Sequence, residues 1–176
     1  RGLVGSEMCI RDRKEREYFL NRFRGNEDCD LQSLIGMEIE EEEEQTLIGF
    51  CVLGGIFGEG IDLKKDSLIG VIVVGTGLPQ VGCEREILKD YFDDNGENGF
   101  DYSYRYPGMN KVLQAAGRVI RTAEDVGIIV LLDERFRQYS YRRMFPREWE
   151  QVVPVTVDTV AKKVERFWDA WLWQQR

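Results

Sequence analysis

The sequence contains no histidine among its 176 residues. Because histidine is the commonest general base in enzymes, its absence excludes triad mechanisms that depend on an imidazole. Cysteine is scarce, and Cys9, Cys29, Cys51 and Cys83 are widely spaced with no C-x-x-C pair. Thiolate metal sites need clustered ligands, so no metal site is expected in this chain. Any chemistry must rest on carboxylates, arginines or backbone amides.

Long apolar runs are also missing. No stretch approaches the roughly 18 apolar residues that a membrane-spanning helix requires, and the N-terminus lacks the apolar core of a signal peptide. We expect a soluble, cytoplasmic protein with no membrane partner. A hydrophobic content of 43% is enough to build one main globular unit.

The sequence also lacks a phosphate loop. The pattern G-x-x-x-x-G-K-[ST] occurs nowhere, and no acidic pair that could hold Mg²⁺ follows an upstream strand. The chain cannot by itself grip a nucleoside triphosphate in the usual way.

Charge is unevenly distributed along the chain. The formal net charge is −8, yet residues 111–147 hold eight basic residues against four acidic ones. Much of the acid lies in the run 38–44, which is typical of a solvated loop or helix face. A local basic zone in an acidic chain favours a specific anion site over a broad surface that follows phosphates.

Short apolar runs alternate with helical patterns. The runs 46–53, 68–75 and 127–133 predict buried strands, and residues 14–24, 84–94 and 157–172 predict helices. Residues 95–106 predict a connection rich in Gly and Tyr, and Thr156 is a candidate N-cap of the last helix. This order predicts an α/β fold with a parallel sheet flanked by helices.

The stretch MNKVLQAAGRVIRT, residues 109–122, predicts a helix with two different faces. An apolar stripe is formed by Met109, Val112, Leu113, Ala116, Val119 and Ile120. Gln114, Arg118 and Arg121 recur on another face. Gly117 lies mid-helix, where glycine costs roughly 1 kcal/mol relative to alanine, so something is expected to approach it closely.

Two glycine-rich loops follow predicted strands, where ligands bind in open parallel sheets. The loop GGIFGEGIDL, residues 54–63, allows backbone amides to approach an anion, and Asp62 could accept a hydrogen bond from a sugar hydroxyl. The loop GTGLPQVG, residues 75–82, is similar to a dinucleotide fingerprint, but its third glycine is displaced and Pro79 interrupts the turn.

Three segments together resemble the C-terminal motor domain of the DinG/XPD-like superfamily 2 DNA helicases. They are residues 54–63, LIGVIVVGTGLPQ (68–80) and YPGMNKVLQAAGRVIRTAEDVGIIVLLDERF (106–136). The first resembles helicase motif V, and QAAGRVIR resembles motif VI. The resemblance covers residues 14–149 and implies a RecA-like parallel sheet flanked by helices, incomplete at its N-terminus.

The resemblance assigns roles to individual residues. It implies that the γ-phosphate of ATP is faced by Gln114, Arg118 and Arg121. It implies that ATP binding is coupled to DNA through Gly58, Glu59, Gly60 and Asp62. A supporting role is implied for Asp133, Arg135 and Phe136, which match the motif that trails motif VI.

The family's N-terminal motor half is absent from this sequence. That half carries the phosphate loop, so it would hold most of ATP with Mg²⁺, and in many members it holds a 4Fe-4S cluster. We therefore expect a fragment with ATP, single-stranded and duplex DNA and the missing motor domain as partners. Residues 1–13 fit no family element and are similar to translated sequencing adapter. The expected organisation is a non-native tail (1–13), a C-terminal RecA-like helicase domain (14–150) and a C-terminal amphipathic helix (151–176).

The expected function is the C-terminal half of an ATP-dependent DNA helicase. Arginine fingers would serve ATP hydrolysis coupled to translocation on single-stranded DNA and duplex unwinding, and the fragment alone would be inactive. Two alternatives remain open. One is a non-catalytic α/β interaction module anchored through the Trp-rich final helix, and the other is a dinucleotide-binding domain that uses Gly75, Gly77 and Gly82.

Overall fold

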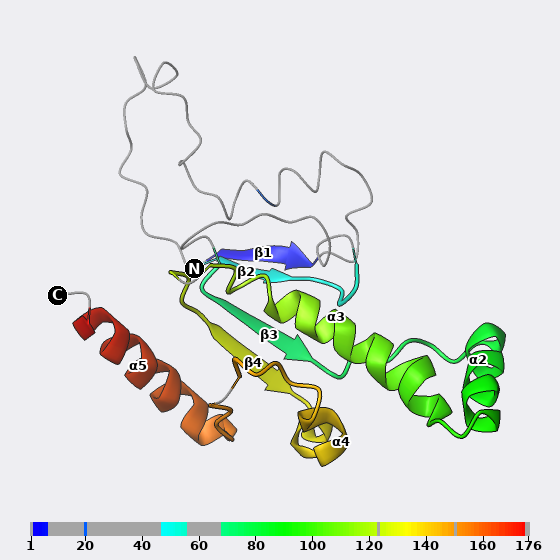
Figure 1. Ribbon diagram of the computed structural model, residues 1–176. Coiled ribbons are helices and arrows are strands. Elements are labelled where there is room, and N and C mark those ends of the chain that lie inside the picture. The colour runs from blue at the N-terminus through cyan, green and yellow to red at the C-terminus, as the bar shows by residue number, and fades with distance from the viewer. Residues whose placement is uncertain are drawn as a thin grey trace. The chain divides into compact units, whose positions relative to one another are not determined.

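The computed structural model describes residues 2–6, 20, 47–55, 68–122, 124–149 and 151–174. These fall into two compact units, Arg1–Phe136 and Arg137–Arg176, which are described separately. The first contains β1 (Gly2–Ser6), β2 (Leu47–Phe50), β3 (Gly70–Val74), α2 (Cys83–Asp94), η4 (Asp101–Arg105), α3 (Tyr106–Ala116) and β4 (Ile128–Leu132) (Figure 1). The short 3-10 helix η5 (Glu134–Arg137) spans the boundary, and the second unit contains α4 (Tyr139–Arg142) and α5 (Val157–Gln174).

All observed strand pairs are parallel. β1 pairs with β2, and β3 pairs with β4 in an unbroken register from Gly70 opposite Ile128 to Val74 opposite Leu132. The small parallel sheets and the helices confirm the α/β class. The strand predicted at 46–53 ends early, because the Gly55 amide donates to the Val52 carbonyl at 2.9 Å and closes a turn. β1 was not predicted and lies within residues 1–13, whose non-native origin stays a prediction.

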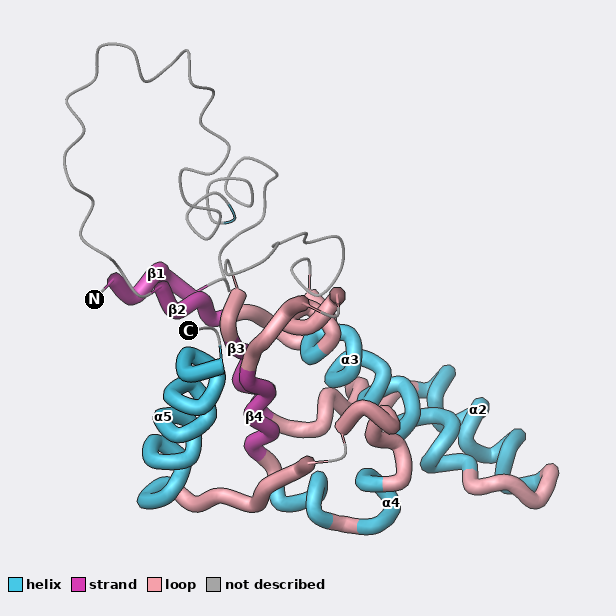
Figure 2. The backbone as a smooth tube through the Cα atoms, turned by 60° about the vertical axis from the view of Figure 1, so that its left-hand side comes forward, coloured by secondary structure: helices cyan, strands magenta, loops and turns pink. Residues whose placement is uncertain are grey.

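The core of the first unit forms where α3 packs on β3 (Figures 1 and 2). Four members of the predicted apolar stripe are buried: Met109, Val112, Ala116 and Val119. Val73 of β3, the strand that α3 contacts, is buried as well. Ile72 and Val74 point to the other face and are 64% and 74% exposed. The prediction of a packed face on this helix is confirmed.

The predicted extent of this helix is wrong, because α3 ends at Ala116 and not at Thr122. After Gly117, the amides of Arg118 and Val119 donate to carbonyls three residues back, at 3.2 and 3.1 Å. Glycine favours helix ends over helix interiors, and the turn buries Val119 while leaving Ile120 46% exposed. Gln114 is therefore on the helix, whereas Arg118 and Arg121 lie beyond it.

The connection predicted at 95–106 is also wrong, because helical structure begins at Gly99 and continues through the π-helix η4 into α3. Asn98 acts as an N-cap, since its side-chain oxygen accepts a hydrogen bond from the Asp101 amide at 3.0 Å. Gly99 donates to Asp93 Oδ1 at 2.8 Å and thereby ties the start of this helix to α2.

Pro107 lies inside this continuous helix and requires an adjustment in the backbone. Proline has no amide hydrogen, so it cannot bond the carbonyl four residues earlier, which belongs to Ser103. Arg85 of α2 supplies the missing donor, with Nη1 placed 2.8 Å from the Ser103 carbonyl oxygen. The π-helical turn immediately before Pro107 is where such irregularity is expected.

α5 begins directly after Thr156, as predicted. The Thr156 carbonyl accepts the first helical hydrogen bond, from Val160 at 2.9 Å, and the Thr156 amide donates to Thr159 Oγ1 at 2.9 Å. Much of its apolar stripe is solvent-exposed within the second unit, and Trp173 is 76% exposed. In the part of the chain that is described, no helix is both long and apolar enough to cross a membrane. The helix predicted at 14–24 lies outside the described residues except for Leu20, which is helical and buried.

A close backbone approach holds α3 at the carboxyl end of β3. Gly77 has φ +65°, and a Cβ atom built on it would lie 2.8 Å from the Gly108 carbonyl oxygen. A Cβ on Gly108 would lie 2.6 Å from the Thr76 carbonyl oxygen and 3.1 Å from the Leu78 amide nitrogen. Both glycines are needed because backbone meets backbone at this point.

We predict that Gly108→Ala lowers the free energy of unfolding of this chain. Alanine favours the helix by about 1 kcal/mol, but the clash with a fixed backbone costs about 1–3 kcal/mol, so a net loss of up to about 2 kcal/mol is expected. Urea unfolding measures the change. Gly82→Ala is the matched control, since its Cβ would meet nothing within 4 Å and its φ of −157° is extended. Equal stability of the two variants would contradict the packing argument.

Candidate functional site

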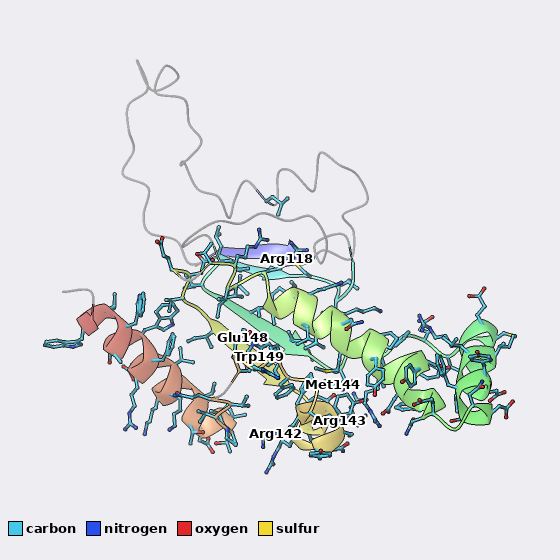
Figure 3. The ribbon with its side chains drawn as sticks, in the orientation of Figure 1. Arg118, Arg142, Arg143, Met144, Glu148 and Trp149 are labelled. Carbon is cyan, nitrogen blue, oxygen red and sulfur yellow. The ribbon has the colours of Figure 1, made fainter. Side chains whose placement is uncertain are left out.

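The predicted phosphate-facing residues lie at the end of α3 and in the loop that leads to β4. Gln114 is exposed on the last turn of α3, Arg118 is half-buried and Arg121 is exposed. Figure 3 shows Arg118 where α3 ends. The structure thus brings the three into one short stretch, although the prediction that they share a helix face is wrong.

A buried contact fixes the loop between Arg118 and Arg121. Val119 is 3% exposed, and a Cβ atom on Gly127 would overlap Val119 Cγ1 and lie 3.0 Å from the Ile69 carbonyl oxygen. That same carbonyl accepts a hydrogen bond from the Ile128 amide at 3.0 Å, where β4 begins beside β3. Val119 therefore anchors the loop against the start of the strand pair, and Gly127 provides the space.

A second restraint on this loop comes from Asp125. Its Oδ2 accepts hydrogen bonds from the amides of Arg121 and Thr122, at 2.9 and 2.7 Å. These two bonds are the main reason that the pKa of the Asp125 carboxyl is below its ordinary value. Sequence reasoning missed this residue, although the spacing Thr122-x-x-Asp125 is that of a capping box.

The trailing motif forms a compact ion pair at the end of β4. Arg135 donates to Asp133 through Nε at 2.9 Å and through Nη2 at 2.6 Å, and the Arg135 amide also donates to Oδ1 at 2.9 Å. Phe136 is buried. The Arg135 guanidinium lowers the pKa of the Asp133 carboxyl. This geometry agrees with a supporting role, which stays a prediction.

The loop resembling motif V is described only at its start. Gly54 has φ +78°, and a Cβ atom on it would lie 2.9 Å from Lys111 Cδ, so the end of β2 meets α3. Lys111 precedes Gln114 by three residues and shares its side of the helix. Further along the loop, four residues with predicted roles lie outside the described residues: Gly58, Glu59, Gly60 and Asp62.

The glycines of the loop 75–82 have structural partners. The Gly75 amide donates to the Leu132 carbonyl at 3.1 Å and extends the pairing of β3 with β4. Gly77 meets the backbone of Gly108, and Gly82 precedes α2 in an extended conformation. These roles account for the glycines without a dinucleotide. Among the described residues, no group of three or more carboxylates, thiols or imidazoles could hold a metal ion.

Comparisons with known proteins identify the class of this domain. Residues 3–152 match the helicase C-terminal domain family, and the chain belongs to that family. The resemblance to the C-terminal region of DinG/XPD-like superfamily 2 helicases is confirmed by individual relatives.

Three of these relatives are named helicases. The chain is 30% identical over 140 residues to a regulator of telomere elongation helicase 1 homolog of Caenorhabditis elegans, a match that covers 73% of this chain and 14% of the relative. It is 34% identical over 95 residues to the ATP-dependent DNA helicase chl-1 of the same organism, covering 53% of this chain and 11% of the relative. It is 35% identical over 89 residues to the ATP-dependent DNA helicase DinG of Photobacterium profundum, covering 49% and 13%. The chain thus spans less than a quarter of each of these relatives.

We predict that the Asp133–Arg135 pair stabilises this chain above acidic pH. The pKa of Asp133 is lowered on folding from its ordinary value of 3.8, so its contribution is present above that pH and is lost as the pH falls through the folded value. Asp133→Asn should lower the free energy of unfolding by about 1–2 kcal/mol near neutrality.

The measurement is urea unfolding of both proteins from about pH 7 to about pH 2, and the difference between them should stay constant down to about pH 4 and narrow below it. Glu134→Gln is the control, because it removes an adjacent exposed carboxylate. A difference that is constant with pH, or is matched by Glu134→Gln, would rule out the ion pair as the cause.

Proposed function

We propose that this chain is the second motor domain, RecA-like in fold, of an ATP-dependent DNA helicase. In this proposal residues 14–150 form the motor domain and residues 151–176 a C-terminal helical extension. The supporting observation is the placement of Arg118 and Arg121 on either side of the anchored Val119, in a chain with no phosphate loop. Arginines so placed complete a nucleotide site that another domain builds.

The chemistry of these side chains fits a γ-phosphate. A guanidinium presents several N–H donors in a rigid fork that matches phosphate oxygens, and it is charged at all working pH values. Arg118 is held at a half-buried position whereas Arg121 is exposed, and the Gln114 amide can donate to phosphate or to an attacking water. In the transition state, charge spreads over the phosphoryl oxygens, and the two arginines would stabilise it there.

ATP with Mg²⁺ would be held mainly by a phosphate-loop motor domain, with the metal neutralising charge between the phosphates. The described residues of this chain supply arginines and an amide, and they include no group of three or more carboxylates or thiols that could hold a metal ion. Gly58, Glu59, Gly60 and Asp62 would couple the nucleotide to the DNA track, along which hydrolysis drives translocation on single-stranded DNA and unwinding of the duplex. Any 4Fe-4S cluster would belong to the N-terminal half of the parent protein. A cytoplasmic location is part of the proposal, because Cys83 is an exposed free thiol of the kind that reducing compartments maintain.

One observation favours a second candidate, a non-catalytic interaction module. α5 presents apolar side chains to solvent within its own unit, including Phe167, Leu172 and Trp173. Such a face marks a protein contact more often than a cofactor site. That candidate requires a stable complex with a partner protein whether or not nucleotide is present. The dinucleotide-binding alternative loses support, because the backbone of Gly108 already fills the space beside Gly77 that a dinucleotide would need.

The coding sequence upstream of residue 14 provides the first test. A phosphate loop followed by an acidic Mg²⁺-binding motif in the same reading frame is the expected result. A gene product without either would overturn the proposal.

We predict that Arg118→Ala or Arg121→Ala in the full-length enzyme removes most ATPase activity. Arginine fingers contribute about 10³–10⁵ in rate, which corresponds to about 4–7 kcal/mol of transition-state stabilisation. DNA affinity should stay close to wild type, because the arginines act on the γ-phosphate of ATP and do not contact DNA in this proposal.

ATPase activity is measured as the steady-state rate with saturating single-stranded DNA, and DNA affinity is measured by a DNA titration of each variant. Arg166→Ala is the control, because it removes an exposed arginine of α5, outside the matched helicase domain. ATPase rates within about threefold of wild type in both finger variants would exclude the role.

A further inference from the structure

The turn that carries Arg121 is closed by reciprocal hydrogen bonds between Thr122 and Asp125. Asp125 Oδ2 accepts from the amides of Arg121 and Thr122, at 2.9 and 2.7 Å, and the Asp125 amide donates back to the Thr122 carbonyl at 3.3 Å. Thr122 Oγ1 accepts from the Glu124 amide at 3.3 Å. The bond from the Thr122 amide to the Asp125 carboxylate is one half of a capping box, but Thr122 Oγ1 accepts from Glu124 and no helix follows.

The backbone around Arg121 has little support from packing, because Val119 is the one deeply buried residue in the described part of the loop. Both Arg121 and Thr122 are exposed. Backbone that is exposed and lacks a ladder of hydrogen bonds opens easily. The Asp125 carboxylate supplies two hydrogen bonds to the backbone at the position where Arg121 leaves the chain.

We propose that Asp125 is the positioning residue of Arg121: its carboxylate fixes the backbone of Arg121 and Thr122 and so presents the guanidinium to the nucleotide. Asp125 itself touches neither substrate nor metal. This inference rests on the proposed function, since it assigns a support to one of its arginine fingers. A misplacement of about 1 Å in a group that acts on the transition state can cost about 100-fold in rate.

The ionisation state of the Asp125 carboxylate favours its role as a hydrogen-bond acceptor. The two amide hydrogen bonds, with a smaller contribution from the charge of Arg121, hold the pKa of Asp125 below its ordinary value. The acceptor is therefore ionised throughout the neutral range. Hydrogen bonds from an amide to an ionised acceptor are stronger than those to a neutral one.

We predict that Asp125→Ala in the full-length enzyme lowers kcat for ATP hydrolysis by about 10- to 100-fold and leaves the KM for ATP and the affinity for DNA near wild type. Asp125→Asn should recover most of the rate, because its amide oxygen can still accept from both backbone amides. Glu124→Ala is the matched control, since it removes an adjacent exposed carboxylate to which none of the described residues donates a hydrogen bond.

A double variant separates positioning from general destabilisation. If Asp125 acts through Arg121, then Asp125→Ala added to Arg121→Ala leaves the residual rate unchanged, whereas a merely structural role lowers it further. Amide hydrogen exchange in the 176-residue chain gives an independent readout that needs no activity. Exchange at Arg121 and Thr122 should accelerate in Asp125→Ala and stay unchanged in Glu124→Ala.

The outcomes distinguish this inference from the proposed function. If Arg121→Ala keeps full ATPase activity, the finger role of Arg121 is excluded. Hydrogen exchange then still measures whether Asp125 orders the backbone of Arg121 and Thr122. If Arg121→Ala is inactive but Asp125→Ala matches Glu124→Ala in rate, the positioning role is overturned while the finger role stands. Loss of rate in Asp125→Ala that Asp125→Asn does not restore, or that adds to Arg121→Ala, also overturns it.

Discussion

The burial of Val119 against Gly127 is the constraint on which this domain depends. The apolar stripe of α3 packs on β3 through Met109, Val112 and Ala116, and Val119 extends that stripe after the helix has ended. Since Gly127 has no side chain, the loop can return close to Ile69 at the point where β4 starts to pair with β3. The same contact that completes the core therefore determines where both arginines of the site leave the backbone.

Close contacts with the backbone also join the elements of the first unit to one another. Gly77 and Gly108 permit the carboxyl end of β3 to touch the first turn of α3, where any larger residue would clash. Pro107 leaves the Ser103 carbonyl without its helical donor, and Arg85 replaces that donor from α2. An unbonded buried carbonyl costs about 1–3 kcal/mol. The hydrogen bond from Arg85 avoids this cost, and it also joins α2 to the continuous helix that carries Gln114.

The sequence predicted the elements better than their ends. The strands β3 and β4 follow from short continuous apolar runs, and the helices α2 and α5 follow from their helical patterns. The helical segment after Gly99 was missed, since glycine and tyrosine composition outweighed the N-cap signal of Asn98. The two-faced helix was extended too far, because the spacing of Arg118 and Arg121 fits a helix as well as it fits a turn. Only the tertiary contact between Val119 and Gly127, which no local pattern encodes, decides between them.

The motif predicted Arg118 and Arg121 as site residues, whose role stays a prediction, but it did not predict the contacts of Val119 and Asp125 that hold their backbone. On the proposed function, these arginines act across a gap, on phosphates that another domain binds, and a side chain delivered in this way contributes only if its backbone is already ordered. A long loop would lose the gain to conformational entropy as the two domains close. Val119 is buried two residues before Arg121, and the Asp125 side chain binds the Arg121 amide itself, so the backbone of Arg121 is restrained from both sides as such preorganisation requires. If Arg121 is a finger residue, its action would therefore also depend on Asp125 and Gly127, neither of which would touch the nucleotide.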